Sequence, residues 1–197
     1  MIGLEEQQRL LALARGALEA RVRRQSPPPA ERGGALDWTR GAFVTIHLLG
    51  DLRGCLGHVE TGAPLADTIA NLAAAVSDSD PRFDAVSALE LDGIELEISV
   101  LTPEREIQSI ADIDVGRHGL IVEQGPRRGL LLPQVATEHG WDASTFACHV
   151  CLKALLSPNA WREGARMLVF EAQVFGESGR VSGQRHSGLG AGQRAAD

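Results

Sequence analysis

A chain of 197 residues has room for one ordinary hydrophobic core or for two small lobes that share an interface, but not for two large independent domains. Hydrophobic residues make up 44% and charged residues 23%, close to globular averages, and no apolar run is long enough to span a bilayer. The net charge of −7 argues against nucleic acid as a partner, because the chain as a whole does not attract a phosphate backbone.

The N-terminus and the cysteines indicate a cytoplasmic protein. Glu5 and Glu6 stand where a secretory signal peptide would carry positive charge. The three cysteines cannot all pair within one chain, and so sparse a set is typical of free thiols in a reducing compartment. We therefore expect neither a membrane segment nor structural disulfides.

The first part of the chain predicts a helix and then a β-hairpin. Apolar residues recur at helical spacing from Leu4 to Arg24. Residues Gly41 to Leu49 are rich in β-formers, Gly50-Asp51 is a two-residue turn signal, and Leu52 to Gly57 is the returning strand. This arrangement places Cys55 on a hairpin, four residues beyond the turn.

The middle of the chain predicts a helix and a strand. Apolar spacing from Pro64 to Val76 indicates a second amphipathic helix with proline at its first position. Ser87 and Glu90 form a capping pattern for one further helical turn. Residues 94–100 alternate between apolar and polar, the period of a strand with one buried and one polar face, whereas 107–113 is ambiguous between short helix and loop.

The last part predicts three strands and a helix. Two strands at 119–123 and 129–132 are joined by a Gly-Pro loop, Asp142 caps a helix that runs to Ala154, and Ala165 to Phe175 forms a final strand. From Gly176 onward six glycines in 22 residues predict a disordered tail, 176–197, whose removal leaves the melting temperature almost unchanged. Strands mixed irregularly with helices favour an α+β fold.

The segment Leu52 to His58, with the sequence LRGCLGH, holds a cysteine between two glycines. Glycine weakens a strand, so Gly54 and Gly57 indicate that something needs room beside Cys55, through positive φ or close backbone approach. Reactive thiols are often housed in this way. The alternative is that the cysteine is a small apolar filler in the core.

Neighbouring polar residues extend this hypothesis to a catalytic group. Arg53 would favour the thiolate, and either His58 or His47, a candidate cross-strand neighbour, would act as base. Glu97 would orient that histidine. The plainer interpretation is that His47 is an ordinary strand histidine and that Glu95 and Glu97 lie on a solvated strand face.

The remaining motifs give weaker indications of function. No dinucleotide, phosphate-binding, zinc-protease or serine-hydrolase signature occurs in the sequence, so no cofactor and no metal site are predicted. Cys148 and Cys151 form a C-x-x-C pattern, but it falls inside a predicted helix, where the helix dipole does not favour a thiolate. Asp80 and Arg82 stand around a proline, either as a loop clamp or as a substrate anchor.

Four of these segments occur in an order that resembles one family, the AMMECR-one domain family, named after the AMME syndrome candidate region. The segments are LRGCLG at 52–57, DPRF at 80–83, ELEISVL at 95–101 and GLLLPQVA at 129–136. The resemblance covers about residues 5–175, and we take 1–175 as the domain. It implies an α+β fold of two unequal lobes with antiparallel β-sheet flanked by helices, and a cleft near the Arg-Gly-Cys segment.

The resemblance also implies a site and a cellular context. Arg53, Gly54 and Cys55 carry over as the site, with Asp80 and Arg82 as supports. Two residues depart from the family pattern, since Leu56 replaces a common isoleucine and Cys148 is not part of that pattern. Bacterial and archaeal members resemble the A component of the AmmeMemoRadiSam gene group, beside a Memo-type protein and a radical SAM enzyme, which implies such partners without naming a substrate.

Two hypotheses follow for the function. The first is an enzyme or covalent carrier in which Cys55 is the nucleophile and acts on an unknown small molecule or peptide. The second is a non-catalytic adaptor that uses the same cleft to bind a peptide or a partner enzyme.

Overall fold

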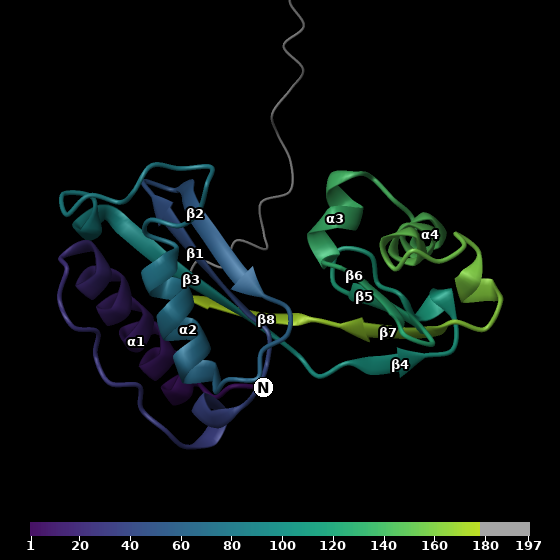
Figure 1. Cartoon of the computed structure of the whole chain (residues 1–197), viewed down its shortest axis with the longest axis horizontal. Helices are drawn as coiled ribbons and strands as arrows, with labels where there is room; N and C mark the ends of the chain where they lie inside the picture. The colour runs from purple at the N-terminus through teal and green to yellow at the C-terminus, as the bar shows by residue number, and fades with distance from the viewer. Residues whose placement is uncertain (178–197) are drawn as a thin grey trace, which may run out of the picture.

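Two four-stranded antiparallel sheets divide the chain into two lobes, which lie side by side in Figure 1. The structure is a computed structural model, and it describes residues 1–177. The lobes, with helices flanking each sheet, confirm the predicted α+β class. The N-terminal lobe holds α1 (Leu4–Val22), β1 (Ala42–Leu48), β2 (Asp51–His58), α2 (Leu65–Ala75), β3 (Ile94–Leu101) and β8 (Ala172–Gly176). The C-terminal lobe holds β4 (Arg105–Ile107), β5 (Gly119–Gln124), β6 (Arg127–Leu131), α3 (Pro133–Glu138), α4 (Ala143–Lys153) and β7 (Arg166–Phe170).

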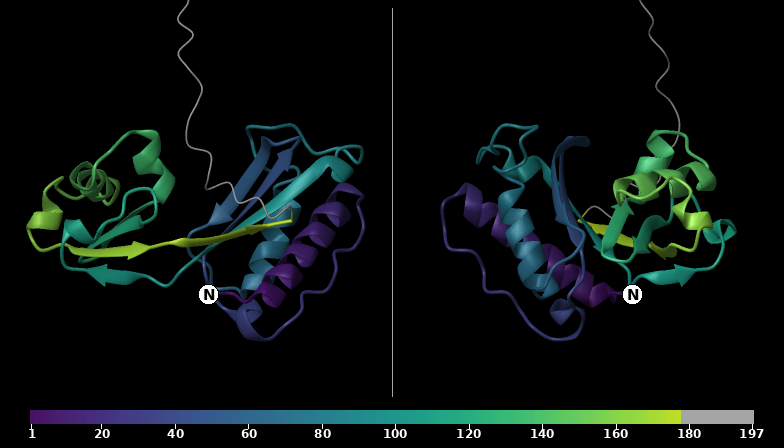
Figure 2. Two further views of the ribbon diagram at one scale, coloured as in Figure 1. Left: turned by 180° about the vertical axis from the view of Figure 1, so that it is seen from behind. Right: turned by 45° about the vertical axis from the view of Figure 1, so that its right-hand side comes forward.

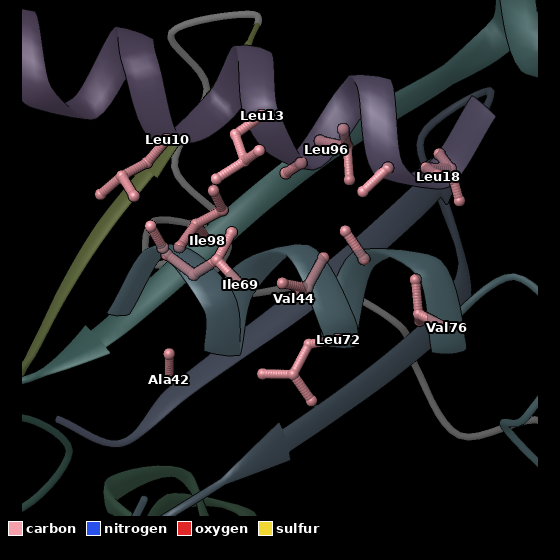
Figure 3. Close-up of a cluster of buried hydrophobic side chains, with 14 of the residues drawn as sticks. Leu10, Leu13, Leu18, Ala42, Val44, Ile69, Leu72, Val76, Leu96 and Ile98 are labelled. Atoms are coloured by element: carbon pink, nitrogen blue, oxygen red, sulfur yellow. The ribbon is translucent and has the colours of Figure 1, made fainter. Parts of the chain in front are cut away.

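The first sheet has the strand order β2-β1-β3-β8, and both α1 and α2 pack on one of its faces. Figure 3 shows leucines of the two helices meeting alternate residues of the strands, among them Val44 and Ile98, which are fully buried. The intervening residues of each strand point to the other face. In Figure 2, on the right, that second face looks away from the helices, toward the C-terminal lobe. We call it the open face of the first sheet.

The hairpin of β1 and β2 differs from its prediction by one residue at the turn and by a bulge. Leu49 and Gly50 form the turn, with φ of 54° and 90°, and Leu48 pairs with Asp51. Both values lie in the left-handed region, which a two-residue hairpin turn of type I′ requires. The predicted turn at Gly50-Asp51 is therefore wrong by one residue. The register also shifts between Ile46 and His47, so the strand pairing differs from the expected one.

The second sheet has the order β4-β7-β5-β6 and packs against α4. Asp142 caps α4 as predicted, because its carboxylate accepts a hydrogen bond of 2.7 Å from the backbone N–H of Thr145. Helix α3 was not predicted, although Pro133 is its first residue. The single final strand is wrong: the chain breaks at Glu171 into β7 and β8, which belong to different sheets.

Two short 3-10 helices precede strands of the first sheet, and two lie in the C-terminal lobe. They are Gly34–Asp37, Leu91–Gly93, Ile110–Asp112 and Ala160–Arg162. The ambiguous segment 107–113 contains one of them together with the last residue of β4. None of the helices within residues 1–177 has the length and hydropathy that crossing a membrane requires.

The lobes are joined by two chain crossings and an apolar contact. At the crossings, the backbone N–H of Thr102 donates to the carbonyl of Glu171 at 2.8 Å, and the N–H of Glu171 donates to the Thr102 hydroxyl at 2.9 Å. Beside them, Leu101 of the first sheet clusters with Ile121 and Phe170 of the second. The crossings and this cluster hold the two lobes together.

The predicted disordered tail begins too early. Gly176 is the last residue of β8, and the Glu177 carboxylate accepts hydrogen bonds of 2.9 Å from the Arg15 guanidinium and from the backbone N–H of Leu96. For these two residues the prediction is wrong, because they complete a sheet edge. The rest of the predicted tail, 178–197, lies outside the described residues.

Removal of Gly176 to Asp197 is therefore expected to destabilise the protein by about 1–3 kcal/mol, since it leaves the backbone N–H of Leu96 without its acceptor and the half-buried Arg15 without its carboxylate partner. Arg15 keeps its hydrogen bonds to the carbonyls of Leu91 and Ile94. The reference is a chain that ends at Glu177. Urea unfolding of the two chains side by side measures the difference. Equal midpoints would show that the Glu177 contacts contribute nothing.

Candidate functional site

Cys55 lies on the open face of the first sheet, on the edge strand β2. Its neighbour across the sheet is Thr45 of β1, whose hydroxyl donates to Cys55 Sγ at 3.3 Å. The backbone N–H of Cys55 points outward from the sheet, so the pair is of the non-hydrogen-bonded kind, in which side chains approach most closely. The thiol is half-buried and held beside a hydroxyl donor.

Asp80 and Arg82 occupy the free edge of β2 at this residue. The Asp80 carboxylate accepts from the backbone N–H of Cys55 at 2.9 Å, and Arg82 donates to the Cys55 carbonyl at 3.3 Å. Arg82 also binds both oxygens of Asp80, at 2.9 and 2.7 Å. At Cys55 this pair thus satisfies the outward backbone N–H and carbonyl, which a neighbouring strand would otherwise bond.

The charge on Asp80 is stabilised by these contacts. Its side chain is only 3% exposed. The hydrogen bonds from Arg82, followed by the backbone N–H of Cys55, hold the pKa of the carboxyl well below its ordinary value despite burial. Asp80 therefore supports, as an ionised carboxylate, the backbone of the strand that carries the thiol.

Arg53 does not bind the thiol. Its guanidinium donates to the Glu90 carboxylate at 2.8 Å and to the carbonyl of Asp84 at 2.8 Å. The hydrogen bond from Arg53, with another from the backbone of Ser87, lowers the pKa of Glu90 to about 2. The Ser87 and Glu90 pattern therefore does form a local cap, and it also fixes Arg53 against the loop before β3.

The two glycines serve close packing on opposite faces of β2. Neither has a positive φ. A Cβ at Gly54 would lie 3.0 Å from a methyl group of Val76 in the segment that follows α2, and a Cβ at Gly57 would fall within the ring of Phe43. Of the two reasons expected for these glycines, positive φ is therefore wrong and close approach is correct. The space at Gly54 and Gly57 is therefore taken by the side chains of Val76 and Phe43.

The two candidate histidines lie in different places. His47 pairs with Leu52 and not with Cys55, so the expected direct cross-strand contact is wrong. It is nevertheless on the open face, diagonal to Cys55, and such neighbours are typically about 7–8 Å apart. His58, three residues after Cys55, is exposed and points to the opposite face of β2. The structure thus places His47 on the sheet face that carries the thiol and His58 on the other face.

The two glutamates of β3 complete the open face. Glu97 pairs with Thr45 and Glu95 pairs with His47, so one row across the sheet reads Cys55, Thr45, Glu97. Glu95 is exposed as expected, but Glu97 is only 8% exposed, and the expectation that it is solvated is wrong. A buried carboxylate and a half-buried thiol therefore flank one threonine hydroxyl.

The C-x-x-C pair lies inside α4, as predicted. Cys151 is fully buried in the core of the C-terminal lobe, and burial raises the pKa of its thiol. Cys148 is half-buried. Within residues 1–177 no group of three or more histidine, cysteine or acidic side chains is arranged to hold a metal ion.

The cysteines are expected to react in a definite order. Iodoacetamide should modify Cys55 in the native protein before Cys148, and Cys151 last, because Cys55 lies on a sheet face and the other two lie in a packed helix. Peptide mass spectrometry at successive times measures each rate. A Cys55 that reacts only after denaturation would be a core residue, and the nucleophile hypothesis would fail.

Fold and site together define a two-lobed α+β protein with a half-buried thiol on the edge strand of its first sheet. The family model AMMECR1 matches residues 11–175. The chain belongs to the AMMECR1 family, which confirms the resemblance seen in the sequence.

Several of its relatives come from archaea. A protein of Methanothermobacter thermautotrophicus is 44% identical, with 89% of this chain and 96% of the relative covered. A Methanosarcina barkeri protein is 43% identical, with 84% and 87% covered. The crystal structure of the uncharacterized protein PH0010 from Pyrococcus horikoshii is similar, with a TM-score of 0.64, 38% identity, and 85% and 89% of the two chains covered. The names of these proteins state no activity.

Proposed function

We propose that the protein is a cysteine-centred enzyme or covalent carrier of the cytoplasm, the A component of an AmmeMemoRadiSam system that acts with Memo-type and radical SAM partners. The observation that carries the proposal is the construction around Cys55. A half-buried thiol accepts a hydrogen bond from Thr45, and its backbone N–H is held by the ionised Asp80. So much fixed polar structure is more than a packing cysteine needs.

Each group has a role in this chemistry. The Thr45 hydroxyl stabilises the thiolate of Cys55 by donating to sulfur, and the Arg82 guanidinium, which reaches the Cys55 carbonyl, supplies the nearby positive charge expected of Arg53. His47 takes the thiol proton from its diagonal position. Sulfur then bonds to an electrophilic carbon of a small molecule or peptide, and the leaving group departs with the electron pair of the broken bond.

A non-catalytic adaptor is the second candidate. The ion pair between Arg53 and Glu90 favours it, because it commits to structure a charge that the enzyme hypothesis assigned to the thiol. In this case the open face binds a peptide or one of the partner enzymes.

Replacing Cys55 with serine separates the two candidates. We expect Cys55→Ser to abolish the activity of the gene group in cells while leaving pull-down of the Memo-type and radical SAM proteins intact. Cys148→Ser is the matched control, since it removes a half-buried thiol from α4, and it should retain activity.

The adaptor predicts the reverse pattern. Cys55→Ser would be silent, and charge reversal at Arg82, whose side chain is 56% exposed, would end partner binding. A Cys55→Ser variant that keeps full activity would therefore overturn the proposed catalytic role. A Cys55→Ser variant that is inactive only because it is unstable would be recognised by a lowered unfolding midpoint.

A further inference from the structure

The turn between β1 and β2 presents two leucines to solvent. Leu49 is 90% exposed and Leu52 is 44% exposed. Leu52 pairs across the sheet with His47, so its side chain lies on the open face, in the row next to that of Cys55 and Thr45. Leu49 directly follows the last residue of β1, at the end of the same face. We call these two leucines the hairpin tip.

Leu49 is unfavourable in the free protein for two reasons. Its φ of 54° lies in the left-handed region, where a side chain with a Cβ is strained and where type I′ turns prefer asparagine, aspartate or glycine. Its side chain gains nothing from burial, since almost all of it faces water. Contact with another molecule would bury this side chain and so give the leucine a purpose that the fold alone does not.

The charges beside the hairpin tip are acidic. Asp51 flanks the turn and Glu95 lies on the open face in the row of Leu52, and both are exposed. Within residues 1–177 neither carboxylate forms an ion pair or a hydrogen bond. Arg53, the nearest basic residue along the chain, is bound to Glu90. The hairpin tip is therefore an apolar surface with unpaired negative charge next to it.

We propose that the hairpin tip is a docking surface for a peptide segment of another protein, one that carries apolar side chains next to lysine or arginine. The apolar side chains bury Leu49 and Leu52, and the basic ones face Asp51 and Glu95. Charge decides against a second copy of this chain, because a symmetric contact would bring these carboxylates against their own counterparts. Binding requires no reaction of Cys55, so a Cys55→Ser chain should bind the same segment.

A phage-displayed library of random peptides, selected on the full chain, supplies the probe. We expect the selected peptides to combine leucine or aromatic residues with lysine or arginine, and to bind more weakly as salt rises. Fluorescence anisotropy of a labelled selected peptide measures the affinity. Failure to select any peptide, or selection of acidic peptides, overturns the proposal.

Leu49→Asn separates binding from folding. Asparagine accepts the left-handed conformation and gives the preferred Asn-Gly turn sequence, so the unfolding midpoint should stay the same or rise. Affinity for the selected peptide should fall at least about tenfold, because the variant lacks the apolar side chain that the contact buries. Leu155→Asn is the matched control. Leu155 also has a positive φ, of 59°, and is 81% exposed, but it follows α4 in the C-terminal lobe, so this variant should bind as the wild type does.

Variants at the two carboxylates test the charge. Asp51→Asn and Glu95→Gln should each weaken binding about threefold or more, and together they should remove most of its salt dependence. Glu138→Gln is the control, since Glu138 is an exposed carboxylate on α3 of the other lobe, and it should leave binding unchanged.

Three results would contradict the proposal. If Leu49→Asn binds the peptide as well as Leu155→Asn does, the peptide sits elsewhere. If Leu49→Asn lowers the unfolding midpoint, Leu49 serves the fold and not a partner. If the wild-type chain forms dimers in analytical ultracentrifugation and Leu49→Asn does not, the occupant is a second copy of the chain.

Discussion

Replacing Asp80 with alanine is expected to destabilise the protein by about 2–3 kcal/mol, because the change leaves the outward backbone N–H of Cys55 without its acceptor and removes a charge-assisted pair whose carboxylate is buried. Arg82 recovers part of the loss by hydration, since its side chain is 56% exposed. Urea unfolding at pH 7 measures the effect. Iodoacetamide labelling of the same variant reports whether the edge strand at Cys55 has loosened.

The loss of stability caused by Asp80→Ala depends on pH in a defined way. The pKa of Asp80 is depressed in the folded state, so its stabilising contribution is complete above the unfolded value of about 3.9 and is lost as pH falls through the lower folded pKa. The difference in unfolding free energy between wild type and Asp80→Ala should therefore be constant from pH 8 to 5 and should become smaller only below about pH 4.

Asp78→Ala is the control for this prediction. Asp78 lies in the same loop and pairs with Arg21 at 2.8 Å, but both side chains are accessible to solvent. Such a surface pair contributes about 0–1 kcal/mol, so the loss should be much smaller than at Asp80. Equal losses at the two positions would mean that the contact with Cys55 adds nothing.

Replacing Gly41 with alanine is expected to cost about 3 kcal/mol or more, because the added methyl group meets backbone and not a side chain that can rotate away. Its Cβ would clash with the carbonyl group of Val59 and would lie 2.8 Å from the carbonyl oxygen of His58. Gly41 itself accepts a hydrogen bond of 2.9 Å from the N–H of Leu101. Relief therefore requires the end of β2 to move away from β1.

Gly62→Ala provides the comparison, since a Cβ there has no atom within 4 Å and its φ is not positive. We expect it to unfold at the wild-type midpoint. Urea unfolding of both variants decides the matter. A Gly41→Ala protein as stable as Gly62→Ala would show that the start of β1 adjusts freely.

The elements that the sequence predicted well are those with a long, unbroken pattern. α1 and β3 each repeat their period over most of their length, and the cap of α4 at Asp142 depends on one side chain and its own backbone. Such features depend on interactions between residues that are close in the sequence. The family resemblance added the two lobes, which no single segment indicates.

The site was harder to predict because it depends on register and on distant packing. The partner of Cys55 is Thr45 and not His47, owing to a turn one residue earlier than predicted and a bulge that no residue type announces. Burial of Glu97 depends on what covers the open face, which strand alternation cannot reveal. The division of the last strand at Glu171 follows from the two sheets diverging, a feature of the whole chain.

The pairing of β3 with β8 has a consequence for the order in which the chain assembles. These strands are neighbours in the first sheet, yet the entire C-terminal lobe lies between them in the sequence. Bringing the ends of so long a flexible segment together costs conformational entropy. If the C-terminal lobe forms first, the bonds between Thr102 and Glu171 already hold its ends side by side, and β8 is delivered to the edge of β3 as though by a short loop. Completion of the first sheet, with the Arg15 and Glu177 pair at its edge, is then a late step that depends on the lobe inserted into it.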